Sequence, residues 1–424
     1  MTKGKSAWKV WLAALSILLT VFVWSRGLQE SFSRPSVSPQ LSLHQRELSV
    51  LAEKAFPVAL KSSILGVNPQ QSLKDSLVEI PLDQISDRNR IVIASLENSL
   101  EKRSLFLDSP FSQTSLQNIK KALLNEPIAK TFQISSLKDF EDIRKDPLLY
   151  QLTCKALGGE DSFCIDQQIA KNVSIRLLIS QFLPFIAVIL GSLLLLRQFW
   201  ILVRNKNIAW PKIIALPLSL IDMILLVAGG FVVLGEVFIP AIVLPIVGSF
   251  TQNLAQPIGD SVKVLIGYSA MTLPPLFILR RQIIGLDTFD EPVDGWLQWR
   301  LKPVWKAIFI ALKGWLMVMP LVLGVSWLAN SLFGDQGGSN PLLELVLNSQ
   351  DRLALGLLVL TTVFFAPLFE ELIFRGVLLP VLAKRFGPFW GVIFSALVFA
   401  IAHLSVGELA PLFVLGIGLG LLRL

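Results

Sequence analysis

Two glutamates and an arginine lie inside an apolar run near the C-terminus, where residues 366–375 read APLFEELIFR. A charged side chain at the centre of a bilayer costs at least ~2.5–3.5 kcal/mol on insertion scales, so these three groups need partners, water or a function. Glu371 and Arg375 are four residues apart and therefore share one face of a helix, where they can pair. Glu370 is rotated by about 100° from Glu371 and faces a different neighbour.

A histidine in a second apolar segment is expected to lie at the same depth. The chain has two histidines, and His403 follows Phe399 by one helical turn in the sequence FAIAH. The turn at Arg385–Pro388 is short, so we predict two antiparallel helices with about 22 Å of helix before it and about 24 Å after it. Glu370 and His403 then face one another on neighbouring helices.

These residues allow three interpretations, which the sequence leaves open. A carboxylate and an imidazole that share a partly desolvated cavity could activate water as general base and general acid. In a second interpretation, Asp222, Glu370 and His403 form the proton relay of an ion-coupled transporter. In a third, Glu371 and Arg375 neutralise one another, and Glu370 with His403 only holds together the helices of a catalytically inactive, partner-binding membrane scaffold.

Motifs of other enzyme classes are missing from the sequence. It contains no Walker loop, no H-E-x-x-H motif and no G-x-S-x-G serine elbow, and both cysteines, Cys154 and Cys164, are far from the apolar site. We therefore expect no soluble-type zinc site and no cofactor, and the residue types alone leave a bound metal open.

The composition indicates where such a site must be built. The 424 residues are 53% hydrophobic and 16% charged, with a mean hydropathy of +0.62, whereas an ordinary soluble protein carries about 25% charge. This balance argues against a disordered chain, a collagen-like fibre or a nucleic-acid-binding module. We predict an all-α polytopic membrane protein with about eight spans, and we attribute the net charge of +7 to basic cytoplasmic loops.

The spans are predicted from apolar runs of about 20 residues. They are expected at Trp8–Trp24, Leu177–Leu196, Ile213–Leu234, Val264–Leu279, Ala307–Ala329, Leu353–Phe369 with its continuation to Arg385, Pro388–Leu404 and Leu409–Leu422. The run Val237–Phe250 is short and interrupted by proline, so it is interfacial, re-entrant or part of a kinked span. The first run exceeds a signal-peptide core and no A-x-A-like site follows it, which favours an uncleaved anchor.

We divide the chain into four regions: an anchor (1–26), an extramembrane domain (27–172), a transmembrane bundle with a basic surface linker (173–306) and a C-terminal bundle (307–424). The second region contains no spanning run, and its amphipathic stretches Val92–Phe106 and Leu116–Phe132 predict a small, mainly helical soluble domain. Basic residues before the anchor place this domain on the periplasmic or lumenal side. An oxidising compartment would allow a Cys154–Cys164 disulfide, and two separate thiols are the alternative.

At the site residues the sequence resembles the CPBP family (CAAX protease and bacteriocin-processing, or Abi), whose members include intramembrane CAAX endopeptidases. The E-E-x-x-x-R motif matches Glu370, Glu371 and Arg375, and the F-x-x-x-H motif matches Phe399 and His403. The resemblance covers residues from about Leu353 onward. It implies a glutamic endopeptidase, formerly described as a metalloendopeptidase, in which Glu370 activates water with His403 as its partner. Glu371 and Arg375 would organise the site.

One element of the family pattern has no match here. The family carries a further H-x-x-x-N or H-x-x-x-D motif, which is thought to hold the oxyanion of the reaction, whereas this sequence stops at Leu424 inside an apolar helix. We expect a C-terminal truncation, with a degenerate family member as the alternative. The resemblance implies a peptide or protein substrate at the lipid bilayer, of the CAAX type or another. The sequence identifies neither that substrate nor the oligomeric state.

Overall fold

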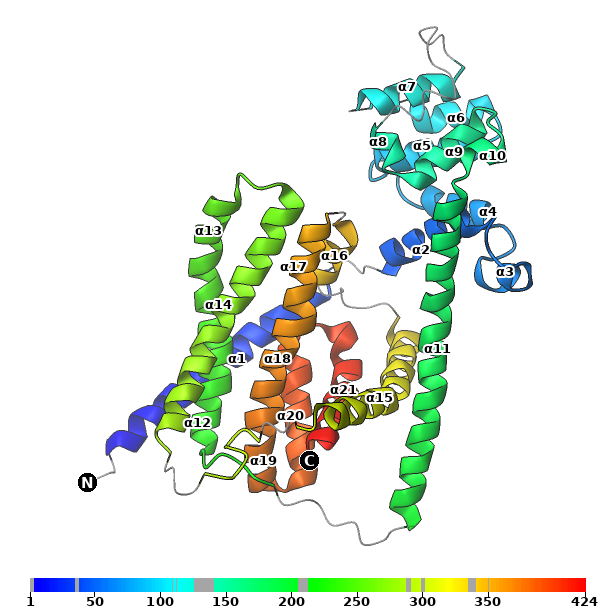
Figure 1. Cartoon of the computed structure of the whole chain (residues 1–424). Helices are drawn as coiled ribbons and strands as arrows, with labels where there is room; N and C mark the ends of the chain where they lie inside the picture. Colours follow the sequence, from blue (N-terminus) through cyan, green and yellow to red (C-terminus); the bar gives the residue numbers. More distant parts are fainter. Residues whose placement is uncertain are drawn as a thin grey trace. The chain divides into compact units, whose positions relative to one another are not determined.

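The computed structural model of the chain describes residues 4–34, 38–108, 110–111, 113–125, 141–204, 213–286, 291–298, 302–334, 341–349 and 351–424. Every regular element in this part of the chain is a helix, as predicted (Figure 1). The chain divides into two compact units. Unit 2 comprises Ser38–Phe185, and unit 1 comprises Met1–Val37 with Ile186–Leu424.

Unit 2 is a cluster of short helices around an apolar core. Its elements are α2 (Ser38–Ala52), α3 (Val58–Ile64), α4 (Pro69–Val78), α5 (Asp87–Leu96), α6 (Leu100–Leu107), α7 (Thr114–Leu123), α8 (Glu141–Arg144), α9 (Pro147–Ala156), α10 (Asp161–Cys164) and the first half of α11 (Gln167–Arg204). Side chains of Asn68, Ser86, Ser99 and Asp146 cap four of these helices by accepting a backbone N–H. Leu73, Ile91 and Ile119 are fully buried in the core.

The amphipathic stretches of unit 2 are helical, with different boundaries from those predicted. The stretch Val92–Phe106 is two helices, because α5 ends at Leu96 and the side chain of Ser99 starts α6. A helix ends at Leu123 within Leu116–Phe132, and residues 126–132 lie outside the described residues. The periodicity of the apolar residues predicts the helical faces, and polar caps decide where a face is interrupted.

Arg88 on α5 joins three segments of unit 2. It pairs with Glu47 on α2 and with Asp146, the N-cap residue of α9. Burial of the guanidinium would lower the pKa of Arg88, but its hydrogen bonds to the two carboxylates outweigh burial, so the pKa is raised. The two ion pairs fix the relative positions of the three segments.

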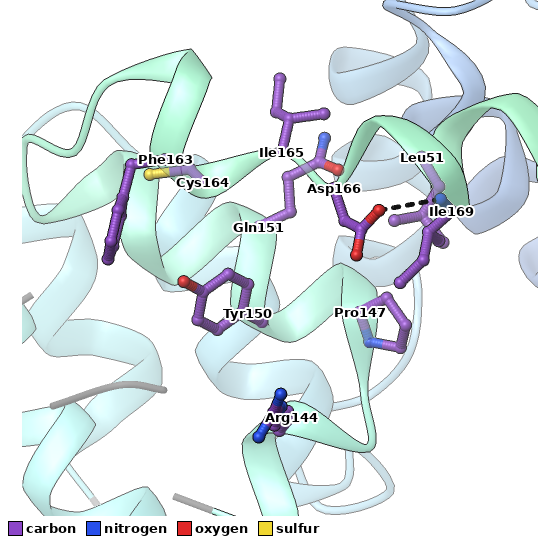
Figure 2. A pocket seen from close by; sticks show the side chains of 10 residues that line it. All are labelled: Leu51, Arg144, Pro147, Tyr150, Gln151, Phe163, Cys164, Ile165, Asp166 and Ile169. Atoms are coloured by element: carbon purple, nitrogen blue, oxygen red, sulfur yellow. Dashed lines mark hydrogen bonds between the residues drawn. The ribbon is translucent and has the colours of Figure 1, made fainter. Parts of the chain in front are cut away.

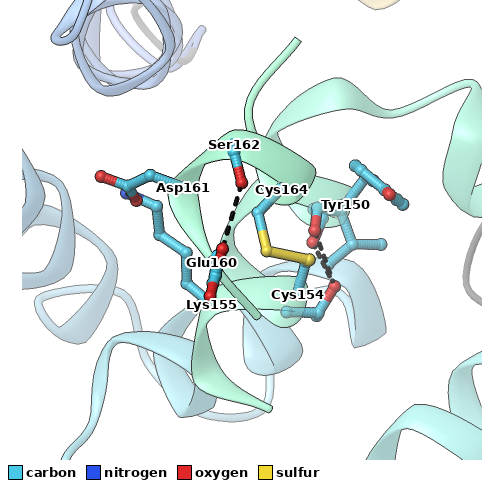
Figure 3. The surroundings of a disulfide bond; sticks show 9 residues. Tyr150, Cys154, Lys155, Glu160, Asp161, Ser162 and Cys164 are labelled. Carbon is cyan, nitrogen blue, oxygen red and sulfur yellow. Dashed lines mark hydrogen bonds and ion pairs between the residues drawn. A yellow bond between two sulfur atoms is a disulfide. The ribbon is translucent and has the colours of Figure 1, made fainter. Parts of the chain in front are cut away.

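Cys154 at the end of α9 and Cys164 at the end of α10 form a disulfide (Figure 3). Both cysteines are buried. The loop that they close carries Asp161, whose carboxylate pairs with Lys155 and with Lys54, both at 2.9 Å. These hydrogen bonds lower the pKa of Asp161 to about 2. The disulfide and the ion pairs together fix α10 against α9.

A pocket of about 330 Å³ opens beside the disulfide (Figure 2). Tyr150, Phe163 and Ile169 contribute to its apolar wall. The Asp166 carboxylate at its edge accepts the backbone N–H groups of Gln168 and Ile169, so it caps α11. The acidic group in this pocket is thus already used by the fold.

The candidate membrane spans lie in unit 1, apart from α11, which begins in unit 2. Among the described residues, seven helices are long and apolar enough to cross a bilayer: Ala7–Ser31, Gln167–Arg204, Leu220–Thr251, Gln256–Ile284, Val304–Leu332, Arg352–Phe386 and Val406–Arg423. Pro388–Ala402 is a shorter apolar helix. The chain is an integral, multi-pass membrane protein, and its seven spans plus one short helix agree with the predicted number.

The elements of unit 1 are α1 (Gly4–Ser31), the second half of α11, α12 (Leu220–Ile224), η2 (Leu225–Phe238), α13 (Ile239–Thr251), α14 (Gln256–Ile284), α15 (Val304–Phe333), α16 (Pro341–Asn348), α17 (Arg352–Val359), η4 (Leu360–Phe365), α18 (Ala366–Glu370), η5 (Glu371–Leu378), α19 (Leu379–Phe386), α20 (Pro388–Ala402) and α21 (Val406–Arg423). The three η elements are π-helical. Residues 299–301, which belong to the predicted basic surface linker, lie outside the described residues.

The bounds of the predicted spans differ from those of the helices, most of all for the third span. The predicted span Ile213–Leu234 starts at Leu220, and it continues through Val237–Phe250 as a single 32-residue helix. Pro240 and Pro245 lie inside this continuous helix, where each removes one backbone hydrogen bond without ending it. This difference matters for Glu236. A span that ends at residue 234 leaves Glu236 in a loop, whereas the continuous helix contains it inside a span.

Glycines bring the last three helices close together. An added Cβ on Gly391 of α20 would lie 2.6 Å from the Cα of Ala383 on α19. On α21, an added Cβ at Gly416 would lie 2.9 Å from the Cα of Ala396 on α20. Such close backbone approach is typical of helices that pack in membranes. It holds α19, α20 and α21 as the frame of the site.

Candidate functional site

The E-E-x-x-x-R residues lie in the middle of one continuous helix, Arg352–Phe386 (Figure 1). The Asp351 carboxylate starts this helix by accepting the N–H of Ala354 at 2.9 Å. Gly387 ends it with a positive φ of 87°, which a glycine adopts without steric cost. The helix is π-helical from Glu371 to Leu378, and π-helical turns within α-helices occur frequently at functional sites.

Arg375 is the buried centre of the motif. Its side chain is 3% exposed, and its Nη1 atom lies 3.2 Å from Oε1 of Glu371, as the i, i+4 spacing predicts. Its guanidinium also lies 4.0 Å from the ring centroid of Phe399 on α20, in a cation–π contact. Glu371 and Phe399 thus both contact the arginine, one through charge and one through its ring.

Helix α20 packs antiparallel against the helix Arg352–Phe386, which we call the motif helix. This packing determines which residues of the two helices lie at the same level. Near the turn, Gly391 contacts Ala383. Further along, the Ser395 hydroxyl donates to the carbonyl of Phe374 at 3.3 Å, and the rings of Phe374 and Phe399 are 5.3 Å apart. His403 lies one turn beyond Phe399, so the register places it level with the turn that contains Glu370.

The His403 ring is oriented by its own helix. Its Nδ1 atom lies 2.8 Å from the carbonyl oxygen of Phe399. A carbonyl oxygen only accepts hydrogen bonds, so Nδ1 must carry the proton, and the Nε2 atom of the neutral ring is left with its lone pair. The Phe399 ring contacts the imidazole edge-on at 4.6 Å. The ring thus presents a hydrogen-bond acceptor.

Glu370 is half-buried and lies within electrostatic range of Arg375 and Glu371. In the described part of the chain, the hydrogen bonds and ion pairs include none that joins Glu370 directly to His403. The expected nearness of the two groups therefore rests on the helix register and not on a contact between them.

The structure adds residues that the sequence did not single out. Glu408 at the start of α21 interacts electrostatically with His403. Arg423, at the other end of α21, donates to the carbonyl of Arg375 at 3.3 Å and to that of Leu297 at 3.0 Å. Both residues lie at the ends of an apolar run, where charged residues are common. Their positions in the sequence therefore did not indicate a role in the site.

Asp222 does not join the site. It forms a capping box with Ser219 at the start of α12, and its carboxylate pairs with Lys9 of α1 at 3.3 Å. It is absent from the groups that interact electrostatically with Glu370 or His403 among the described residues. The structure thus explains Asp222 as a helix cap.

The donor set at the site consists of separate carboxylates and one imidazole. Among the residues that the structure describes, no three histidine, cysteine or acidic side chains gather in a group that could hold a metal ion. A carboxylate and an imidazole are groups that can exchange protons with water.

The fold and the site define a multi-pass helical membrane protein with a carboxylate–imidazole layer in its C-terminal bundle. Residues 352–424 match the family model described as type II CAAX prenyl endopeptidase Rce1-like. This part of the chain therefore carries an Rce1-like domain, consistent with the CPBP family. Residues 38–175 match a domain of unknown function, DUF8675. No curated protein and no solved structure matches the chain.

Proposed function

We propose that the protein is an intramembrane endopeptidase that hydrolyses a peptide bond near the membrane surface by glutamate-activated water. The observation that supports this most directly is the register in which α20 packs against the motif helix. From this register we expect His403 at the same level as Glu370. The Rce1-like match of residues 352–424 supports the same reaction class.

The proposed reaction needs one water molecule. Glu370 removes a proton from that water, while Nε2 of His403 accepts a hydrogen bond from its other hydrogen and orients it. The water oxygen forms a bond to the carbonyl carbon, and the π electrons of the C=O bond move onto the carbonyl oxygen. When this intermediate collapses, the C–N bond breaks and the proton held by Glu370 passes to the leaving nitrogen. The products are a carboxylic acid and an amine.

Glu371 and Arg375 organise the site in this proposal. The Arg375 cation lies within electrostatic range of Glu370 and pairs with Glu371. Phe399 contacts both the guanidinium of Arg375 and the imidazole ring of His403, so one aromatic ring joins the organising arginine to the histidine. We propose a peptide substrate of the CAAX type or another membrane-surface peptide.

The test compares membranes from cells that express the full chain with membranes that carry the Glu370→Gln variant. New carboxyl termini are identified by mass spectrometry in water enriched in ¹⁸O. The proposal predicts termini that carry ¹⁸O and disappear in the Glu370→Gln and His403→Phe variants. Termini that persist in both variants would refute it and favour a scaffold.

A matched control is the Asp222→Asn variant. Asp222 caps α12 and pairs with Lys9, outside the proposed site. The variant should retain cleavage, whereas an ion-coupled relay would lose its function. A flux across proteoliposomes that depends on pH, with no peptide cleavage, would favour the transporter interpretation instead.

For the region between the anchor and α11 we propose a location on the outer side of the membrane. Basic residues lie before the anchor, and the Cys154–Cys164 disulfide suits an oxidising compartment. Trypsin added to intact, right-side-out membranes should cleave this region. Protection from trypsin until the membranes are permeabilised would place it inside.

A further inference from the structure

The chain makes a tight turn directly after His403. Helix α20 ends at Ala402 and α21 begins at Val406, so only residues 403–405 join the two helices. Leu404 in this turn has a φ of 50°, a left-handed conformation that is uncommon for a residue other than glycine. Such a conformation persists only where the surrounding structure fixes it. The contacts of this turn therefore decide where the backbone beside His403 lies.

Helix α1 reaches this turn because one of its faces packs along η2. The Thr20 hydroxyl donates to the carbonyl of Ala228 at 3.3 Å. One turn later, the indole N–H of Trp24 donates to the Oε2 atom of Glu236 at 3.2 Å. Positions three and seven residues after Trp24 continue the same face of the helix. The end of α1 is thus held in place by η2, and its next two turns point in the same direction.

Those two positions, Gly27 and Ser31, contact the turn after α20. Gly27 is buried, and an added Cβ there would lie 2.8 Å from the Cδ1 atom of Leu404, so the missing side chain leaves room for this leucine. Ser31 is fully buried, and its Oγ atom accepts the backbone N–H of Val406 at 3.0 Å. The first N–H groups of a helix have no partner within that helix. Ser405, at the N-cap position of α21, makes no capping bond with its side chain, so Ser31 of α1 supplies one.

Arg34 adds a third contact, from the turn that follows α1. Its backbone N–H donates to the carbonyl of Ser31 at 3.4 Å, which continues the winding of the helix. Its Nη1 atom donates to the carbonyl of Leu404 at 3.2 Å. A hydrogen bond from a cation is stronger than one between neutral groups. The main chain on both sides of Ser405 is therefore tied to residues 27–34, which lie outside the Rce1-like match.

The orientation of the His403 ring depends on this turn. The backbone N–H groups of His403 and Leu404 donate to the carbonyls of Ala400 and Ile401 at 3.3 Å and 3.0 Å, so Leu404 is joined to the last turn of α20. The same turn of the helix holds the imidazole, because Nδ1 lies 2.8 Å from the carbonyl oxygen of Phe399. Helix ends fray unless they are held. If the main chain of Leu404 is released, the imidazole ring is free to move with it.

We propose that Ser31 and Arg34 are positioning residues for His403, which hold the turn after α20 so that the Nε2 atom of the histidine is directed at the reacting water. This inference rests on the proposed endopeptidase function. Each residue acts through the main chain of Leu404 or Val406 and not by contact with the substrate. The anchor helix α1 is then a working part of the active site as well as a membrane span.

The first test measures the cleavage that depends on Glu370, with the full chain in its membrane. Arg34→Met removes the donor and keeps the aliphatic stem, and Ser31→Ala removes the acceptor. Each variant should lower kcat by about 10- to 100-fold while KM stays within about threefold, because a small misplacement of a reacting group is costly. Arg34→Lys should restore most of the rate, because a single carbonyl acceptor does not require the forked geometry of a guanidinium.

Two variants of the same helix are matched controls. The Ser25 hydroxyl donates to the carbonyl of Phe22 within α1, and the Arg26 guanidinium lies over the ring of Phe22. Both residues are exposed. Ser25→Ala and Arg26→Met should therefore cleave at the wild-type rate. The rate of every variant is expressed per folded protein, with the unfolding temperature measured alongside, so that a loss of stability is not read as a loss of kcat.

The second test observes the histidine without any substrate. The chain has two histidines, so ¹³C-labelled histidine gives two imidazole signals in detergent micelles, and the His403→Phe variant identifies the signal of His403. Arg34→Met and Ser31→Ala should shift this signal, whereas the two control variants should leave it in place. The signal of His44, an exposed residue of unit 2, serves as the reference.

The outcomes separate this inference from the function beneath it. Cleavage that depends on Glu370 and keeps its wild-type rate in Arg34→Met or Ser31→Ala would overturn the role of the residue replaced and leave the endopeptidase function standing. A rise in KM at constant kcat would overturn it as well, because it would indicate a contribution to uniform substrate binding. A slower rate with an unshifted His403 signal would also overturn it, since the effect would not act through the histidine. If no product depends on Glu370, the proposed function fails and the positioning role fails with it, even where the His403 signal shifts.

Discussion

Replacing Arg375 by methionine tests whether this arginine is present for stability or for function. The guanidinium is 3% exposed, yet among the described residues neither Nη atom has a hydrogen-bond partner of good geometry. Its 3.2 Å contact with Glu371 is therefore an ion pair without hydrogen-bond geometry. Glu371 itself is 46% exposed, which weakens that pair.

The expected free-energy change of the Arg375→Met variant is small. The substitution removes a desolvated cation–π contact with Phe399, worth about 2 kcal/mol, and a half-exposed ion pair, worth about 0–1 kcal/mol. It also removes two buried donors without partners, each of which costs about 1–3 kcal/mol. We expect the free energy of unfolding to fall by no more than about 1 kcal/mol, because the relieved penalty of the two donors equals or exceeds most of the lost contacts, while cleavage that depends on Glu370 is lost.

The measurement is reversible unfolding in mixed micelles, followed by tryptophan fluorescence. Arg375→Ala is the comparison variant, because it leaves a cavity and should be less stable than Arg375→Met by about 2 kcal/mol or more. A loss above about 3 kcal/mol in Arg375→Met would refute the reasoning, since it would mean that the guanidinium is fully satisfied in the fold.

Three further predictions concern stability. Replacing Cys154 and Cys164 together by alanine should destabilise unit 2 by about 3 kcal/mol in urea unfolding, because the disulfide closes a loop across a sequence separation of 10; unchanged stability would contradict this. The Asp161 pKa of about 2 lies below its ordinary value of 3.8, so the stability it contributes is complete above pH 4 and is lost as the pH falls towards 2. An Asp161→Asn variant should lack this part of the acid transition. Gly391→Ala should lose about 1–3 kcal/mol, because the added methyl group would meet the α19 backbone at 2.6 Å, whereas Gly248→Ala, with open space, should not.

The sequence predicted the helical class and the spans well, because both depend on local spacing, whereas the level of His403 beside Glu370 stays a prediction. Apolar runs of sufficient length identify spans, and a short turn between two helices specifies an antiparallel pair. The i, i+4 spacing of Glu371 and Arg375 likewise gives an ion pair. For these features the neighbours in space are also neighbours along the chain.

The rest of the site depends on contacts between distant segments. Trp24 and Glu236 are more than 200 residues apart, and no local pattern indicates that they meet. Glu236 is a single carboxylate between two apolar runs, which is a pattern that could have indicated a buried acidic group. Because the predicted span ended at residue 234, the prediction did not include it. Asp222 attracted attention for the same reason, although its partners show it to be a helix cap.

The π-helical turns have a genetic consequence for the motif helix. A π-helix closes its hydrogen bonds from residue i to i+5 instead of i+4, so η5 accommodates a residue that a regular α-helix would not. Deleting one residue between Arg375 and Leu378 would let this segment become α-helical. Because the deletion removes the residue that the π-helical turns accommodate, the helix on both sides would keep its present facing, whereas the same deletion in a regular α-helix turns one side by about 100° relative to the other. The motif helix should therefore tolerate the loss of one residue within η5 better than the loss of one residue in its α-helical parts.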